Sequence, residues 1–557
     1  MIRRHLPILG WLPGYRMPWL SKDALAGLSV WALLVPQSLA YATIAGVPVQ
    51  YGLYTAFAAL IAYAVFGTAR QVVQGPSATV AAVSAAVITP LAGAAALGTS
   101  KAAPYAAALA LAAGAVYLAL GALRMGWVSN FLSKAVLCGF VIGFALGIII
   151  DQSYKLLGVD SVDGTYMEEL FGTIKEIPET SGTTLAVGAS CLAVLLLLRH
   201  HRPRWPRALL VMALAIIAAG LLDLADHGVV VTGNVPTGLF SLGRPDIGWS
   251  DTGSLLIGAL SVVFVGFSES LASARMMAQK HGYDIDPNQE LIAQGAACAA
   301  AGLVGGFAND GSLSKSSVAD AAGQRTQMAS LINAGFIILT MVFLAGLFED
   351  LPSAALGAVV IDSMVGLLDF GELRRYRRVN RPDWVFAMGA LLGMLFLGII
   401  QGILIGVVLS LLLLIARSST PGIRQVGRDP KSGAYLDVER HEGLEPTPGA
   451  LVVRVDGPLF FADANRFRDR IKELLAQRPD TVRAVIIDAD AISQSDTDGA
   501  DIIVQLAQEL SVDDVSLVLA RVHASIRDLW ERAGALDVVG TDRVFNTVEE
   551  AVLSERS

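Results

Sequence analysis

Two short polar runs interrupt the apolar sequence of this chain, and both carry residue types that bind anions. The run from Gly311 to Ser317 contains four serines and Lys315, and the run from Gly75 to Thr79 is its counterpart nearer the amino terminus. Each run lies where a short helix would begin inside an apolar segment. A helix start presents unsatisfied N–H groups and the positive end of the helix dipole. Two such starts that face each other are therefore predicted to form an anion site.

Three further polar side chains lie within apolar segments and are candidates for the same site. Gln37 and Tyr41 are one helical turn apart and share a face, so they would donate to an anion or line its cavity. Glu269 lies deep in an apolar segment, where a carboxylate must be paired, protonated or hydrated. It is either a structural partner of Lys315 or Arg275, or a group that accepts a proton.

Other interpretations of these residues stay open at this point. Small residues such as these serines also let membrane helices pack closely. Asp310, beside the serine run, would neutralise Lys315 or coordinate a sodium ion. The chain has no His-Glu-x-x-His, Gly-x-Ser-x-Gly or P-loop motif. We therefore expect no catalytic residues, no metal site and no cofactor, and the chain is not expected to be an enzyme.

The elements that must position these residues are membrane-spanning helices. The 557 residues are 54% hydrophobic and 16% charged, with a mean hydropathy of +0.57, which is too apolar for a soluble protein. About fourteen segments have the length and apolarity of membrane spans. They are residues 25–45, 50–67, 75–91, 104–122, 131–151, 182–198, 208–224, 255–274, 289–306, 313–321, 326–347, 353–369, 384–399 and 401–417.

The basic residues predict the orientation of these segments. Lys and Arg gather in the loops after even-numbered segments, at 199–207, 275–280 and 374–381, and such loops stay on the cytoplasmic side. Both termini are therefore expected in the cytoplasm, with the chain in the inner (plasma) membrane. Gln37 precedes Ser77 by 40 residues, and Glu269 precedes Ser314 by 45. Two halves of seven segments each would then form an inverted repeat.

The carboxyl-terminal part has a different composition. From residue 420 onward the chain has 16 Lys and Arg against 25 Asp and Glu, a net charge of −9, whereas the preceding part has 25 against 24. Alternating strand and helix patterns predict a small α/β domain, and the acidic balance argues against nucleic-acid binding. We expect a cytoplasmic segment at 1–22, a transmembrane domain at 23–419 and a regulatory or interaction domain at 420–557.

Six sequence blocks follow one another along the chain: Pro36–Ala42, Val49–Ala56 with Gly67–Arg70, Gly266–Ser270, Asn288–Leu291, Gly311–Ser316 and Ala322–Thr326. In this order they resemble the SulP family, the solute carrier family 26 anion transporters. The tail resembles the STAS domain that ends most of these proteins, with Asp498 at the position where related domains carry a phosphorylatable Ser or Thr. The block that begins at Val49 and continues to Arg70 departs from the family pattern at Ala62 and Ala69, where a serine is usual.

The resemblance implies an α-helical polytopic membrane protein with core and gate subdomains, a homodimer and an elevator-like movement of the core. It also implies a central anion site between the starts of the third and tenth spans. Many relatives have arginine where this chain has Lys315. The lysine keeps the positive charge but cannot donate the two parallel hydrogen bonds of a guanidinium. By motif, the site would be lined by Gln37, Tyr41, Ser77, Ser314 and Lys315, with Glu269 as the proton-coupling residue.

The function expected from residues and resemblance together is secondary active transport of a small anion. Sulfate, bicarbonate and dicarboxylate all fit, and the coupling ion is a proton or sodium. Two alternatives remain: an uncoupled anion channel, and an anion-sensing membrane scaffold that acts on a cytoplasmic protein through the STAS domain. A nucleobase carrier of similar architecture is disfavoured, because such carriers resemble neither the Ser-Leu-Ser-Lys run nor the tail.

Overall fold

The structure, a computed structural model, divides the chain into two compact units, Met1–Ser410 and Leu411–Ser557. The expected domain boundary at 419–420 and the basic residue Arg204 lie outside the described residues. The described residues are 6–127, 133–160, 164–202, 205–233, 247–248, 251–418, 422–445, 447–478 and 482–555.

Every one of the fourteen predicted segments contains a helix, so the prediction of an α-helical polytopic membrane protein is confirmed. Seven of these helices, some with their short continuations, are long and apolar enough to cross a membrane, and three more are apolar but shorter. The helices are α3 (Leu20–Ile44), α4 (Gln50–Phe66), α5 (Ala78–Ala92), α6 (Ala103–Ala122), α7 (Lys134–Leu157), α9 (Gly182–His201), α10 (Arg207–Leu221), α11 (Thr252–His281), α12 (Pro287–Leu303), α13 (Leu313–Ala321), α14 (Met328–Leu339), α15 (Ser353–Val365), α17 (Arg381–Leu397) and α18 (Ile399–Ser418).

Segments that the sequence suggested were loops also contain helices. The basic residues near 374–378 lie in α16 (Phe370–Val379) rather than in a loop. The connection after α7 contains α8 (Tyr166–Glu176), whose first turn is closed by reciprocal hydrogen bonds between Thr165 and Glu168. The amino-terminal segment forms the short helix α2 (Ile8–Trp11) before α3 begins.

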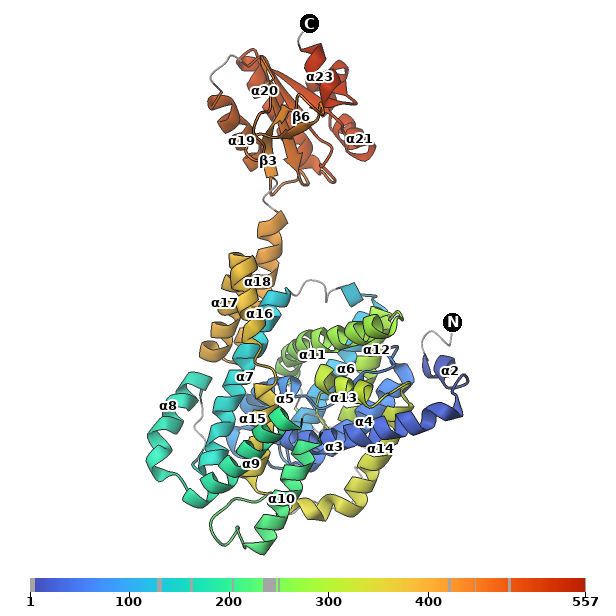
Figure 1. The fold of residues 1–557 in the computed structure, drawn as a ribbon, viewed down its shortest axis with the longest axis vertical. Coiled ribbons are helices and arrows are strands. Elements are labelled where there is room, and N and C mark those ends of the chain that lie inside the picture. Colours follow the sequence, from blue (N-terminus) through green and yellow to red (C-terminus); the bar gives the residue numbers. More distant parts are fainter. Residues whose placement is uncertain are drawn as a thin grey trace. The chain divides into compact units, whose positions relative to one another are not determined.

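The helices of the first unit form two packing groups (Figure 1). In one group, α12 packs on α4 and α6, and α14 packs on α3 and α4. In the other, α7 packs on α9, α15 and α17. Helix α3 also contacts α10 and α15 and so joins the two groups. Gln37 and Tyr41 lie on this joining helix.

Two motif residues have clear packing roles in the first group. A Cβ added at Gly52 in α4 would lie 1.9 Å from the carbonyl oxygen of Ser38, so only glycine allows α3 and α4 to approach this closely. Glu290 at the start of α12 accepts a 2.6 Å hydrogen bond from the Tyr63 hydroxyl and a 2.8 Å bond from the Thr68 backbone N–H. These contacts fix the chain where it leaves α4.

The second unit is a six-stranded sheet in the order β4-β3-β5-β6-β7-β8. Strands β5 to β8 run parallel, and β3 pairs antiparallel with β5 and with β4. The sequence patterns predict strands at 451–455, 483–488 and 515–519, which correspond to β5, β6 and β7. They do not predict β3, β4 or β8. The strands are β3 (Gly422–Arg428), β4 (Tyr435–Asp437), β5 (Ala450–Asp456), β6 (Ala484–Asp488), β7 (Ser516–Ala520) and β8 (Val544–Phe545).

Helices cover both faces of this sheet. Alternate strand residues point to opposite faces, and the two faces form two separate apolar clusters. Helices α19 (Ala464–Ala476), α20 (Thr497–Val512), α21 (Ala524–Arg532) and α22 (Ala535–Val539) cover one face, and α23 (Val548–Ser554) covers the other. This arrangement is the small α/β domain that the sequence predicted.

One buried carboxylate in this unit has no hydrogen-bond partner among the described residues. Asp463, just before α19, is fully buried, and neither of its side-chain oxygens is bonded. Burial raises the pKa of this carboxyl above its usual value, and the nearby Arg466 only partly offsets the shift. The ionised side chain therefore destabilises the folded domain.

Replacing Gly52 by alanine is expected to destabilise the membrane unit. The new methyl group must push α3 and α4 apart, and overpacking of this kind costs about 1–3 kcal/mol. Thermal unfolding of the purified protein in detergent would measure the loss. Gly335→Ala is the matched control, because a Cβ at Gly335 meets no atom within 4 Å. Equal melting temperatures for the two variants would contradict the packing role of Gly52.

Replacing Asp463 by asparagine is expected to stabilise the second unit by about 1 kcal/mol at neutral pH, because it removes a buried unpaired charge. The pKa of Asp463 is raised on folding, so its penalty is absent below the usual carboxyl range near about pH 4. It develops as the pH rises through the folded-state pKa. Urea unfolding of a fragment from residue 420 should show the gain at pH 7 and its loss toward about pH 4. A pH-independent difference would contradict this explanation.

Candidate functional site

The two polar runs meet in the middle of the first unit as a two-stranded ribbon. Strand β1 (Val73–Gly75) pairs antiparallel with β2 (Asp310–Ser312), with Gly75 opposite Asp310. Every residue of both strands is buried. A membrane protein must satisfy its non-helical backbone internally, and the ribbon does so where both apolar segments are interrupted.

A helix begins immediately after each strand, and the sequence predicted both of these helix starts. Helix α5 follows β1, and the Ser77 hydroxyl caps it by accepting a 3.3 Å hydrogen bond from the Val80 N–H. Helix α13 follows β2 directly, with Ser312 at its cap position. The hydroxyls of Ser312 and Ser314 lie 3.0 Å apart, and Ser314 is exposed. Both helix starts therefore leave backbone N–H groups available near the ribbon.

Lys315 joins the two runs. Its side chain is 1% exposed, and its ammonium donates a 2.5 Å hydrogen bond to the carbonyl oxygen of Pro76. A Cβ at Gly75 would lie 3.7 Å from the Lys315 Nζ atom and 3.3 Å from Leu34, so the ammonium lies directly against this glycine. The lysine of α13 thus binds the backbone at the start of α5.

Two carboxylates share the surroundings of this ammonium. Asp310 is fully buried, and neither of its side-chain oxygens has a hydrogen-bond partner among the described residues. Glu269 and Lys315 lie within electrostatic reach of Asp310, and Ser77 lies close to it. Glu269, on α11, also lies close to Thr79 at the start of α5. One cation and two carboxylates therefore meet between the helix starts.

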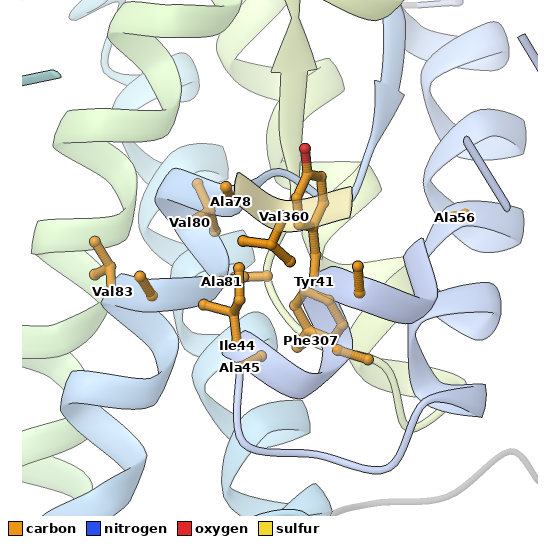
Figure 2. Packing of buried hydrophobic residues seen from close by; sticks show 14 of the residues in the cluster. Tyr41, Ile44, Ala45, Ala56, Ala78, Val80, Ala81, Val83, Phe307 and Val360 are labelled. Atoms are coloured by element: carbon orange, nitrogen blue, oxygen red, sulfur yellow. The ribbon is translucent and has the colours of Figure 1, made fainter. Parts of the chain in front are cut away.

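Gln37 and Tyr41 reach the same region from α3. Both are buried, and the Gln37 side-chain oxygen has no hydrogen-bond partner among the described residues. Tyr41 interacts with Ser363 of α15 and lies within electrostatic reach of Glu269 and Asp310. Figure 2 shows the Tyr41 ring beside apolar side chains of α5 and α15, with its hydroxyl beyond them.

A layer of amides holds the ribbon from behind. The Gln74 side-chain NH₂ donates to Gln294 at 2.8 Å and to Asn309 at 2.9 Å. The Gly311 N–H donates to the Ser270 hydroxyl at 2.5 Å, and that hydroxyl donates to Gln294 at 2.9 Å. These bonds connect both strands to α11 and α12 and leave the opposite side of the ribbon for the charged groups.

A vestibule of about 1410 Å³ approaches the site but does not include any of the predicted site residues. It is lined by the last turn of α3, including Thr43 and Ile44, and by the middle and end of α5 from Ala82 to Thr89. The residues between it and the helix starts, such as Ala78 and Ala81, are apolar and buried (Figure 2). An apolar layer about one helical turn thick therefore separates the vestibule from the charged cluster.

The structure brings the predicted site residues together around the ribbon. Lys315 is directed to Pro76 rather than into open space. Asp310 belongs to the charged cluster, although the sequence left it undecided between pairing and sodium binding. Ser363 was not predicted, because an isolated serine near a helix end gives no sequence signal. Among the described residues, no group of three or more His, Cys, Asp or Glu side chains is arranged to hold a metal ion.

Comparisons with known proteins identify the family of this chain. The profile of the Sulfate permease family matches residues 20–390, and that of the STAS domain matches residues 435–551. A probable sulfate transporter of Mycobacterium tuberculosis is 34% identical over 98% of both chains. The chloroplastic Sulfate transporter 4.1 of Arabidopsis thaliana is 28% identical over 98% of this chain and 82% of that protein.

Solved structures share the fold. The murine Solute Carrier 26 family member A9 anion transporter in the inward-facing state superposes with a TM-score of 0.91 at 24% identity, over 100% of this chain and 94% of that one. The transmembrane domain of the cyanobacterium bicarbonate transporter BicA gives a TM-score of 0.62 at 21% identity, over 71% of this chain and 98% of that one. The resemblance noted in the sequence is therefore confirmed.

Replacing Lys315 by glutamine is expected to weaken anion binding more than tenfold. Hydrogen bonds to charged groups contribute about 1.5–3 kcal/mol, and about 1.4 kcal/mol corresponds to a factor of ten. Titration calorimetry with sulfate on the purified protein would measure the change. Lys315→Arg should retain most of the affinity, and Lys175→Gln, an exposed lysine of α8, is the charge-matched control. Unchanged sulfate affinity in Lys315→Gln would remove this lysine from the site.

Proposed function

Because this chain belongs to the sulfate permease family and is therefore an anion transporter rather than an enzyme, we propose that it is a proton-coupled secondary transporter of a small oxyanion. The observation that carries the proposal is the charged cluster of Lys315, Asp310 and Glu269 between the starts of α5 and α13. Gln37, Tyr41, Ser77 and Ser314 supply the neutral donors. Substrate binding is assigned to these neutral residues together with Lys315.

The charge balance of this cluster supports proton coupling. Two carboxylates and one ammonium are buried together, and burying unbalanced charge is costly. The cluster is neutral only when one carboxyl carries a proton. An entering anion adds a further negative charge, which favours protonation of the second carboxyl. Glu269 is assigned this role because it is less enclosed than Asp310, so a proton can reach it more readily. Sodium is the alternative coupling ion.

The separation of the site from the vestibule supports alternating access. Ser314 is exposed although it does not line the vestibule, and we assign this exposure to an access path away from the vestibule. The basic segments predict that the amino-terminal end of α3 is cytoplasmic, which places the vestibule outside and the opening to Ser314 inside. An elevator-like movement of the first packing group past the second would then carry the site across the apolar layer. The apolar layer supports alternating access over a continuous channel.

The substrate and the assembly follow from the relatives as proposals. Relatives are named for sulfate, and a structural neighbour is named for bicarbonate, so sulfate is the first substrate to test, with bicarbonate and dicarboxylates next. We assign residues 23–419 to the transport domain and 420–557 to a cytoplasmic STAS domain. A homodimer in the plasma membrane, with the STAS domain available to a cytoplasmic protein partner, completes the proposal.

Replacing Glu269 by glutamine is expected to abolish proton coupling while leaving the site folded. In proteoliposomes with an acidic exterior, the intact protein should concentrate labelled sulfate, whereas Glu269→Gln should equilibrate sulfate but not accumulate it. The measurement is uptake with and without an imposed pH gradient. Glu349→Gln is the control for removing a carboxyl from the same unit outside the site.

Three outcomes would count against the proposal in different ways. Accumulation by Glu269→Gln that equals that of the intact protein would exclude Glu269 as the coupling group. Accumulation driven by a sodium gradient would replace the proton as the coupling ion. Currents too large for a cycle of conformational changes, without any accumulation, would favour the channel.

A further inference from the structure

A second polar cavity, distinct from the central site, lies beneath the amino-terminal segment. Its volume is about 360 Å³, and we refer to it as the basic pocket. Its two arginines, Arg70 and Arg325, belong to the sequence blocks Gly67–Arg70 and Ala322–Thr326, which have no part in the proposed transport mechanism. It is lined by Gly10, Trp11, Gly14, Trp19, Gly67, Thr68, Ala69, Arg70, Gln71, His281, Tyr283, Arg325, Thr326 and Gln327.

The two arginines of the basic pocket have no carboxylate partner in the described part of the chain. The Arg70 guanidinium lies 5.0 Å from the centre of the Tyr283 ring, which orients it without neutralising it. The Arg325 backbone N–H donates to Asp23, but its exposed side chain forms no ion pair with a described residue. Both groups keep their full complement of donors for a ligand.

The acids nearest to the pocket are committed to other groups. Glu290 accepts from Tyr63 and from the backbone of Thr68, behind the pocket wall. Asp320 pairs with His281 at 2.6 Å and with Lys280 at 2.5 Å. No Asp or Glu is among the described residues that line the pocket. The wall therefore presents two unpaired guanidinium groups. Each guanidinium can bind two oxygens of one phosphate at the same time.

The surroundings of the pocket are those of a membrane interface. Trp11 and Trp19 form one wall, and the Trp11 indole N–H is buried without a partner among the described residues. Tryptophan is enriched at the boundary between lipid and water. Apolar side chains of the adjoining segment, including Met17 at 76% and Leu9 and Leu12 at 41%, are exposed, as in segments that insert into the lipid boundary.

From these observations we propose that the basic pocket binds the phosphate headgroup of an anionic phospholipid in the cytoplasmic leaflet. Arg70 and Arg325 hold the phosphate, the Trp11 N–H donates to it, and the exposed apolar residues of the amino-terminal segment lie among the acyl chains. Basic pockets on the cytoplasmic side of membrane proteins bind such headgroups. The inference rests on the cytoplasmic placement of the amino terminus in the proposed function, but not on transport.

The test is lipid-dependent thermal stability of the full-length protein in nanodiscs of phosphatidylcholine, with or without phosphatidylglycerol. Phosphatidylglycerol should raise the melting temperature of the intact protein, and Arg70→Gln with Arg325→Gln should remove at least half of that rise. The control pair is Arg374→Gln with Arg378→Gln, two exposed arginines of α16 outside the pocket. It should retain the rise.

Each remaining outcome of this experiment is decisive. No rise with the intact protein, or equal loss in both variant pairs, would overturn the proposal. An equal rise with inorganic phosphate or glycerol 3-phosphate in phosphatidylcholine nanodiscs would replace the lipid by a soluble phosphate. If the double variant melts lower than the intact protein without anionic lipid, the lipid-dependent rise is measured with Arg325→Gln alone, because that side chain is exposed. Flux is not measured, so failure here leaves the transport proposal intact.

Discussion

The hydrogen bond from the buried Lys315 ammonium to the Pro76 carbonyl is the interaction on which the site depends. An ammonium is costly to remove from water, and it is retained here because a backbone oxygen and two carboxylates surround it. The bond connects the start of α13 to the corner that precedes α5. Together with the β1–β2 ribbon, it fixes two helix starts that come from segments more than 200 residues apart. The neutral donors of α3 are arranged around this connection.

Much of the family-like sequence serves this arrangement rather than the anion itself. Gly52 allows α3 to approach α4, and Glu290 holds the chain between α4 and β1. The amides of Gln74 and Gln294 bind the ribbon from behind. A substitution at any of these positions would move the helix starts without touching the substrate. Sequence blocks of this kind therefore contain residues that position the helix starts as well as residues that would bind the anion.

The sequence was sufficient for the helices and for the positions where α5 and α13 begin, because both follow from hydropathy and its interruptions. The apolar segments predicted each membrane helix, and the polar runs predicted where α5 and α13 begin. The ribbon was not predicted, because strands of three residues carry no periodic pattern, and their pairing joins distant parts of the chain. The hydrogen bond from Lys315 to Pro76 and the burial of Asp310 beside Glu269 depend on tertiary packing. Helix α16 was missed because its basic residues suggested a loop. Strands β4 and β8 were missed because they are short edge strands, and β3 because two glycines and several polar residues interrupt its alternation.

The antiparallel ribbon has a consequence for the energetics of the proposed cycle. Because β1 pairs with β2, the starts of α5 and α13 are joined, and in the proposed cycle both halves of the site would travel together. An anion then meets the same donors at the same distances whichever side the site faces. Its dissociation constant at the inner and outer surfaces would be nearly equal, so the protein itself supplies no bias in direction. Any concentration ratio across the membrane must come from the coupled ion, and reversing that ion's gradient would turn uptake into export.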